Sequence, residues 1–218
     1  MSAGGASPLS TQELLALDTF VPPLRALGRV GLVGGSFNPP HIGHVLMALS
    51  VYATEELDHL WVLPTADHAL GKSLAPFADR LRMCHLAFRH FAGGVAVVDL
   101  ENRLPKPSYT VNLLRALHAL RPGIKPVWIV GADIVHELPL WKEPEEVQRL
   151  ARFVVVPREG YENGGFAVRL QVPLPLLSST DVRDRIMRGA SVEGLLDREV
   201  ASYIERRGLY RSGVEGPG

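Results

Sequence analysis

Residues 29–44 read RVGLVGGSFNPPHIGH, and this stretch says most about the fold. Its first five residues form an apolar run of strand length, and the Gly34-Gly35 pair predicts a tight turn directly after that strand. A proline-stiffened loop follows, and a helix is expected to begin near His41. The stretch therefore predicts a buried strand that leads through a glycine turn into a helix.

Apolar runs and helical patterns alternate through the rest of the chain. Four more runs have strand length and a fifth is weaker, at residues 59–63, 95–98, 126–130, 152–156 and, weakly, 166–170. Apolar residues at three- and four-residue spacing predict helices between them, at 44–56, 79–91, 108–120 and 143–150. This alternation predicts an α/β fold, a Rossmann-like doubly wound parallel sheet with helices on both faces. Ligands of such sheets bind outside the carboxyl ends of the strands, so the turn after Val33 is expected to line the site.

The two ends of the chain flank a single domain that we expect at residues 29–210. Residues 1–28 form an extension of unassigned role, in which Ser10 and Glu13 predict a capping box that opens a short helix. After Pro173 only helices are expected, one beginning at a second capping box around Ser178 and one running from about 196 to 207. They would form a small C-terminal helical segment. Residues 211–218 are expected to be a disordered tail.

Composition narrows the class of protein. The chain has 218 residues, 46% of them apolar, which is enough for one sizeable core. Lys plus Arg and Asp plus Glu balance at 23 each, so the whole surface carries no basic footprint for nucleic acid or an anionic membrane. The single Cys84 excludes an internal disulfide, and no segment has the signal-peptide or membrane-helix pattern. A globular cytoplasmic protein is the expectation, and a homo-oligomer stays open.

The stretch from Gly34 to His44 is suited to binding phosphate. Two glycines let the backbone approach a ligand, and the N–H groups at a helix start favour an anion. His41 and His44 are three residues apart, so both rings share one helix face, and Gly43 between them keeps that face open. A lone histidine pair is more often a cap and a surface residue, but here it follows an apolar strand and a glycine turn. A zinc site is a weaker alternative, because no third ligand stands at a recognisable spacing.

With these residues the chain resembles the HxGH superfamily of nucleotidyltransferases, and more closely the bacterial nicotinate-nucleotide adenylyltransferases. The resemblance extends through most of the chain from Arg29 to Tyr210 and includes several further motifs in the family's order. These are residues 107–110 (PSYT), 131–133 (GAD), 138–141 (LPLW), 158–161 (REGY), 177–183 (LSSTDVR), 203–204 (YI) and 209–210 (LY). The resemblance implies adenylyl transfer from ATP to nicotinate mononucleotide, which yields deamido-NAD and pyrophosphate in NAD biosynthesis.

The resemblance also implies roles for individual residues. The catalytic residues would be His41, His44 and Arg183. The ATP-binding residues would be Gly34, Gly35, Ser36, Phe37, Gly43, Gly131, Asp133, Ser179 and Thr180. The residues that bind the acceptor would be Lys72, Tyr109, Trp141 and Arg158. Taken without the resemblance, residues 178–183 are an ordinary capped helix start, Asp133 is a helix cap and Trp141 is a core or rim aromatic.

The expected chemistry needs neither a general base nor a metal site built from protein ligands. The second pKa of a phosphate monoester is about 6, so the attacking group is already an anion at neutral pH. Catalysis would come from aligning that anion with the α-phosphorus of ATP and neutralising charge on the departing pyrophosphate. Mg²⁺ would arrive on the ATP phosphates and keep its waters.

One segment departs from the family pattern. Where the family carries Pro-Pro-His-Lys, residues 64–73 read PTADHALGKS, so His68 and Lys72 would stand in for the adjacent His and Lys, with Arg80 and Met83 at the family's spacing. A P-loop at Gly71-Lys72-Ser73 lacks its first glycine, and residues 31–35 do not spell the dinucleotide fingerprint. Two alternatives stay open: transfer to another phosphate, such as nicotinamide mononucleotide or phosphopantetheine, and a non-catalytic nucleotide-binding module.

Overall fold

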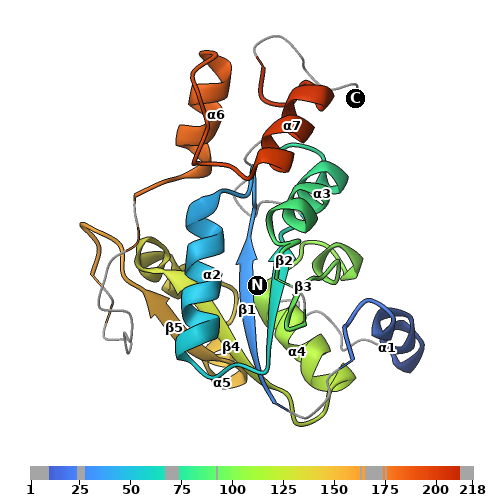
Figure 1. Ribbon diagram of the computed structural model, residues 1–218. Coiled ribbons are helices and arrows are strands. Elements are labelled where there is room, and N and C mark those ends of the chain that lie inside the picture. Colours follow the sequence, from blue (N-terminus) through green and yellow to red (C-terminus); the bar gives the residue numbers. More distant parts are fainter. Residues whose placement is uncertain are drawn as a thin grey trace, which may run out of the picture.

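The protein folds around one parallel sheet (Figure 1). The computed structural model describes residues 10–23, 28–66, 74–91, 93–162, 164, 174 and 176–211. The sheet has five strands in the order β3-β2-β1-β4-β5. They are β1 (Arg29–Gly35), β2 (His59–Pro64), β3 (Val95–Val97), β4 (Lys125–Gly131) and β5 (Arg152–Val156). All neighbours are parallel. The strand order reverses beside β1, which places the crevice expected for a ligand between the carboxyl ends of β1 and β4.

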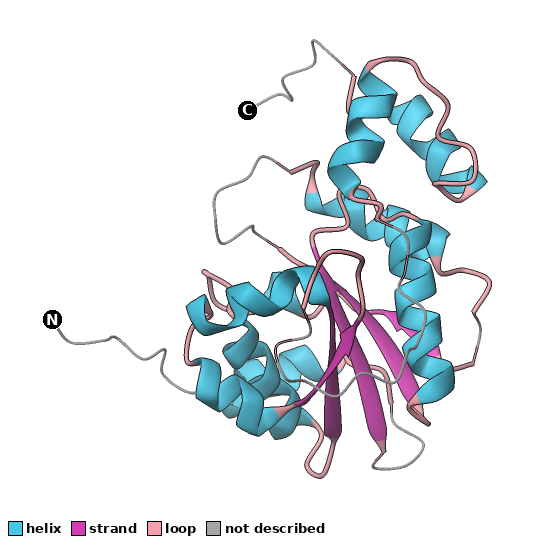
Figure 2. Cartoon of the chain, turned by 90° about the vertical axis from the view of Figure 1, so that its left-hand side faces the viewer, coloured by secondary structure: helices cyan, strands magenta, loops and turns pink. Residues whose placement is uncertain are grey.

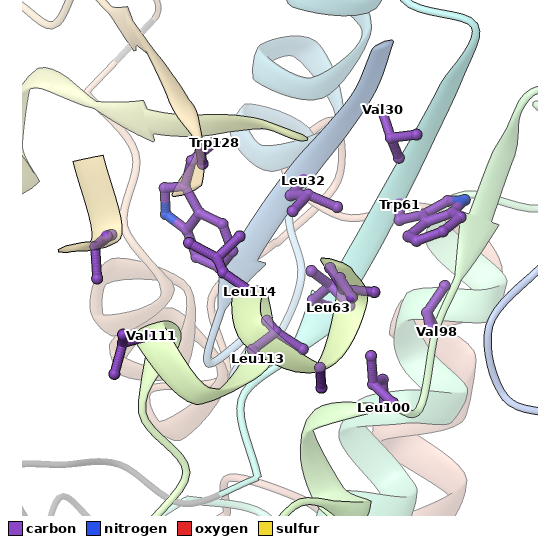
Figure 3. Close-up of a cluster of buried hydrophobic side chains, with 14 of the residues drawn as sticks. Val30, Leu32, Trp61, Leu63, Val98, Leu100, Val111, Leu113, Leu114 and Trp128 are labelled. Carbon is purple, nitrogen blue, oxygen red and sulfur yellow. The ribbon is translucent and has the colours of Figure 1, made fainter. Parts of the chain in front are cut away.

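Helices cover both faces of the sheet (Figure 2). On one face, Val30 and Leu32 of β1 share a core with Leu17 of the N-terminal extension and with residues of α4 (Thr110–Leu120) and α5 (Pro144–Leu150). Figure 3 shows part of this core, with Trp61 and Trp128 on either side of Leu32. On the other face, Val33 shares a core with α2 (Ile42–Thr54), α3 (Phe77–Ala87) and α7 (Arg198–Arg207). Successive side chains of each buried strand point to opposite faces of the sheet, so each strand contributes residues to two cores.

The predicted fold is confirmed, and the element boundaries differ only slightly. The five main strands lie where the apolar runs predict them, and the predicted strand at 166–170 lies outside the described residues. The α2 helix begins at Ile42 with His41 as its N-cap, which agrees with the helix start expected near His41 and precedes the periodic apolar segment predicted from residue 44. Two 3₁₀ segments were not predicted, η1 (Glu101–Arg103) and η2 (Ala132–Leu140).

The C-terminal helices lie beyond the carboxyl end of β1 (Figure 1). The α6 helix (Ser179–Met187) begins at the predicted capping box, in which the Asp181 N–H donates to Ser178 Oγ at 3.1 Å. The α7 helix ends at Gly208, whose φ of 64° is the left-handed conformation that glycine adopts most readily. Of the tail expected at 211–218, only Arg211 is described.

The described part of the N-terminal extension packs into the main core. The α1 helix (Thr11–Asp18) begins at the predicted capping box, where the Ser10 N–H donates to Glu13 Oε2 at 2.8 Å. Leu17 and Val21 are buried in the same core as α4. Arg121, at the end of α4, donates to the Val21 carbonyl at 2.9 Å and pairs with Asp18. No helix among the described residues is long and apolar enough to span a membrane.

Candidate active site

The site begins where β1 turns into α2. Gly34 and Gly35 end the strand, and Phe37 takes a positive φ of 45°. The Phe37 side chain is fully buried and its ring lies 4.9 Å from the His44 ring, centroid to centroid. The Phe37 ring therefore packs against His44, and only the Phe37 backbone is available to a nucleotide.

The two histidines stack on each other at the start of α2. Their ring centroids are 3.8 Å apart, and His41 is only 2% exposed. A Cβ at Gly43 would lie 3.0 Å from His41 Nδ1 and 3.1 Å from its Cε1. The space beside Gly43 is therefore occupied by the His41 ring, which a larger side chain at residue 43 would crowd.

A hydrogen bond determines which ring nitrogen of His44 carries the proton. The His41 backbone N–H donates to His44 Nδ1 at 3.1 Å, so that nitrogen is an acceptor. In the neutral ring the proton is then on Nε2, which can donate to a ligand. His41 Nδ1 is buried and has no hydrogen-bond partner among the described residues.

Burial keeps both rings neutral at physiological pH. It lowers the pKa of His41 to about 4, and the positive charge of Arg158 acts in the same direction. Burial also holds the pKa of His44 well below its usual value, with the neighbouring His41 and Arg158 adding to the effect. A neutral imidazole donates from one nitrogen only, so each ring offers a ligand a single N–H.

The first turn of α6 is attached to the loop that precedes α2. Ser179 Oγ donates to the Pro39 carbonyl at 2.9 Å, and Arg183 Nη1 donates to the Asn38 carbonyl at 2.8 Å. Arg183 Nη2 donates to Thr180 Oγ1 at 3.1 Å. The structure thus brings residues 179–183 beside the loop that leads to the histidines, as the sequence predicts.

A second group lies at the carboxyl ends of β4 and β5. Asp133, in the first turn of η2, forms an ion pair with Arg158, whose Nε lies 3.2 Å from Asp133 Oδ1. A Cβ at Gly131 would lie 2.3 Å from that oxygen and 3.0 Å from the Arg158 nitrogen, so only glycine leaves room for the pair. The positive charge of Arg158 also contributes to the lowered pKa of both histidines.

Trp141 and Tyr109 lie against the core on the other face of the sheet. Both are half-buried, and Trp141 meets Trp128 edge to face with centroids 6.2 Å apart. Lys142 Nζ lies 4.8 Å above the Tyr109 ring, which makes Tyr109 a neighbour of the 141–142 segment. Lys72 lies outside the described residues.

Sequence reasoning did not single out Asn38, which holds the loop before α2 in place. Its side-chain Oδ1 accepts from the Ala75 N–H at 3.0 Å and from the Tyr210 hydroxyl at 2.8 Å. Its carbonyl accepts from Arg183, so this buried residue joins the loop before α2 to the start of α3, to α6 and to the residue Tyr210 that follows α7. Its place between the glycine turn and Pro39 was the only sequence signal. Among the described residues no group of three or more His, Cys, Asp and Glu side chains is arranged to hold a metal ion.

Comparison with known proteins identifies the family. Residues 32–185 match the family model described as cytidylyltransferase-like. The chain is 43% identical over 185 residues to a probable nicotinate-nucleotide adenylyltransferase of Anaeromyxobacter dehalogenans, covering 84% of this chain and 96% of that protein. The chain belongs to the nicotinate-nucleotide adenylyltransferase family. A family member from Myxococcus xanthus, carrying the same probable assignment, is 35% identical over 187 residues, with 86% and 97% of the two chains covered.

The fold of this adenylyltransferase family member is also found in solved structures. The nicotinic acid mononucleotide adenylyltransferase of Plasmodium falciparum complexed with NaAD superposes with a TM-score of 0.71 at 19% identity, covering 84% of this chain and 97% of that one. At that identity the similarity concerns the fold alone. The family assignment that the HxGH stretch and its companion motifs predict is confirmed.

Proposed function

We propose that this chain transfers the AMP half of ATP to nicotinate mononucleotide, giving deamido-NAD and pyrophosphate. The observation that carries the proposal is the stacked, neutral His41–His44 pair at the start of α2, with the first turn of α6 bonded to the loop before it. Family membership supports the reaction, because relatives that are 35–43% identical over most of the chain are named for it. The catalytic domain in this proposal is residues 29–210.

ATP would lie over the crevice between β1 and β4. The backbone of residues 34–37 and the start of α2 would face its phosphates, together with Ser179, Thr180 and Arg183 of α6. The guanidinium of Arg183 adds a positive charge, and a helix start adds N–H donors. Gly131, which ends β4, and Asp133, in the first turn of η2, would contact the nucleoside half of the molecule.

The histidines would act as donors and not as bases. His44 Nε2–H, held in that tautomer by the His41 backbone, can donate to an oxygen of the phosphoryl group under attack. The acceptor phosphate has a second pKa of about 6 and is already ionised, so it attacks the α-phosphorus directly while the bond to pyrophosphate breaks. Rate enhancement then comes from alignment and from donors that meet charge as it develops.

The acceptor would lie on the other side of the transferred group. Arg158 provides a positive charge near the histidines, and Tyr109 and Trp141 provide half-buried aromatic surface that could stack on a pyridine ring. Lys72 completes this proposed set.

Mg²⁺ enters with ATP as part of the substrate, and the enzyme works in the cytoplasm, where ATP is supplied. Thorough chelation should abolish activity, and unchanged turnover without metal would refute the Mg²⁺ proposal.

Pyrophosphate release tests the reaction. The purified protein is given ATP and Mg²⁺ with nicotinate mononucleotide, nicotinamide mononucleotide or phosphopantetheine, each separately. We expect release with the nicotinate form to be fastest. His44→Ala should lower turnover by about a hundredfold, as loss of a transition-state donor does, while replacing the exposed His85 should not. Fastest release with another acceptor would change the assigned substrate, and release with none would favour a non-catalytic binding role.

A further inference from the structure

Arg80 is a buried cation that the proposed reaction does not use. It lies on α3 with 1% of its surface exposed. Its guanidinium donates to four backbone carbonyls: Nε to Ala75 at 2.9 Å, Nη1 to Ser36 at 2.8 Å and to Thr65 at 2.7 Å, and Nη2 to Ala66 at 3.1 Å. The carbonyls belong to three segments: the loop after β1, the end of β2 and the approach to α3. A planar fork with several fixed donors can hold three segments in one arrangement, which a lysine ammonium cannot do.

The peptide groups beside Arg80 are held from both directions. The Ala66 carbonyl accepts from Arg80, and the Ala66 N–H donates to the buried carboxyl of Glu101 at 3.3 Å. The Ala75 carbonyl likewise accepts from Arg80, and the Ala75 N–H donates to Asn38 Oδ1 at 3.0 Å. At Ala66 and at Ala75, on the two sides of the β2–α3 connection, both the N–H and the carbonyl of the backbone are therefore hydrogen-bonded.

The same contacts reach the phosphate-binding loop. Ser36 and Asn38 lie between β1 and the histidines, and both are bonded into the arrangement around Arg80, one directly and one through Ala75. The Asn38 carbonyl also accepts from Arg183. A shift of the Arg80 contacts would consequently move the loop that carries His41 relative to the end of β2.

We propose that Arg80, with Glu101 as its partner at Ala66, is a positioning residue for adenylyl transfer, which fixes the loop after β1 against the carboxyl end of β2. The inference rests on the proposed function. Among the described residues the Arg80 guanidinium donates to backbone carbonyls, one of them in the loop after β1, so its proposed effect is on alignment. A misplacement of about 1 Å can cost roughly a hundredfold in rate, whereas substrate binding tolerates it better.

Arg80→Lys tests this role, because it keeps the charge and loses the fork. We expect kcat to fall by roughly 10- to 100-fold, with the KM values for ATP and acceptor changing less than threefold. The matched control is Glu55→Gln. Glu55 is also a buried charge, bonded to Arg29 and Arg152 at the amino ends of β1 and β5, so its loss should lower the unfolding temperature and leave kcat unchanged. All assays are run with the acceptor that the wild type uses best, below the unfolding temperature of each variant.

A second pair keeps the inference testable if Arg80→Lys does not fold. Glu101→Gln keeps an oxygen that can accept from Ala66 and should retain kcat within threefold, while Glu101→Ala should lose kcat as Arg80→Lys does. Folded Arg80→Lys or Glu101→Ala with kcat within threefold of wild type would overturn the positioning role. A wild type that transfers AMP to no acceptor would instead contradict the proposed function, so the two failures are distinguishable.

Discussion

At the scale of single residues, burial and a charge from a distant part of the chain determine the protonation of His41 and His44. Spacing of three residues on a helix start after a glycine turn was sufficient to propose His41 and His44 as ligands of phosphate. Their neutral state depends on burial and on the charge of Arg158, which follows β5 and lies more than a hundred residues away in the chain. Such long-range effects on a pKa leave no mark on the local pattern.

The depressed pKa of His41 makes stability depend on pH. An unfolded histidine titrates near 6.5 and folded His41 near 4, so between these values the unfolded state binds more protons. The free energy of unfolding should therefore rise as pH increases from about 4 to about 6.5, with roughly 1 to 3 kcal/mol attributable to His41. Urea unfolding of wild type and His41→Gln across this range measures the difference. Parallel pH curves for the two proteins would contradict it.

Gly43→Ala should separate activity from stability. Alanine favours the helix by about 1 kcal/mol over glycine, so α2 itself should not be weakened. The new Cβ would lie 3.0 Å from His41 Nδ1, and the stacked, buried ring has little room to move. We expect kcat to fall about tenfold with an unfolding temperature near or above that of wild type. Wild-type turnover in a well-folded Gly43→Ala protein would show that the ring position is not critical.

At the scale of elements, the starts of α1 and α6 were predicted to the residue. The capping boxes of α1 and α6 were recognised from Ser, Glu and Asp at fixed spacing, because the bonds that form them are local. The η2 segment was missed, since a 3₁₀ helix that contains Pro139 has no clear apolar period. The contacts that join α6 and Tyr210 to the loop before α2 are long-range and could not be predicted without the family resemblance.

Tyr210→Phe tests the attachment of the chain's last helical segment. The substitution keeps the ring and removes the hydroxyl that donates to Asn38 Oδ1 at 2.8 Å. A buried hydrogen bond contributes about 1 kcal/mol, so we expect a loss of that size in the free energy of unfolding, together with a several-fold fall in kcat through Asn38. Tyr161→Phe, at an exposed tyrosine, is the control. A stability loss with unchanged kcat would limit Tyr210 to a structural role.

At the scale of the whole molecule, periodicity was enough for the fold class and not for strand order. Near-continuous apolar runs separated by amphipathic helices indicate a parallel sheet with two covered faces. The order β3-β2-β1-β4-β5 depends on which strands pair in space, and the apolar runs carry no information about that pairing. The role of the N-terminal extension was not predictable, because its partner, α4, lies about a hundred residues further on.

Leu17→Ala tests whether α1 is part of the folded core. Leu17 is 5% exposed and packs in the core shared with α4. Truncation of a buried leucine costs about 2 to 5 kcal/mol, so the urea midpoint should fall clearly. Turnover below the unfolding transition should stay at the wild-type value, because α1 lies away from the carboxyl ends of the strands (Figure 1). An unchanged midpoint would mean that the extension does not stabilise the domain.

The central claim is that the α-phosphate of ATP moves to the acceptor. The most direct measurement uses ATP labelled at the α-phosphorus with nicotinate mononucleotide and Mg²⁺, followed by mass analysis of the products. The account predicts that the label appears in deamido-NAD and that the pyrophosphate released is unlabelled. Label in AMP alone, or a dinucleotide without label, would contradict it.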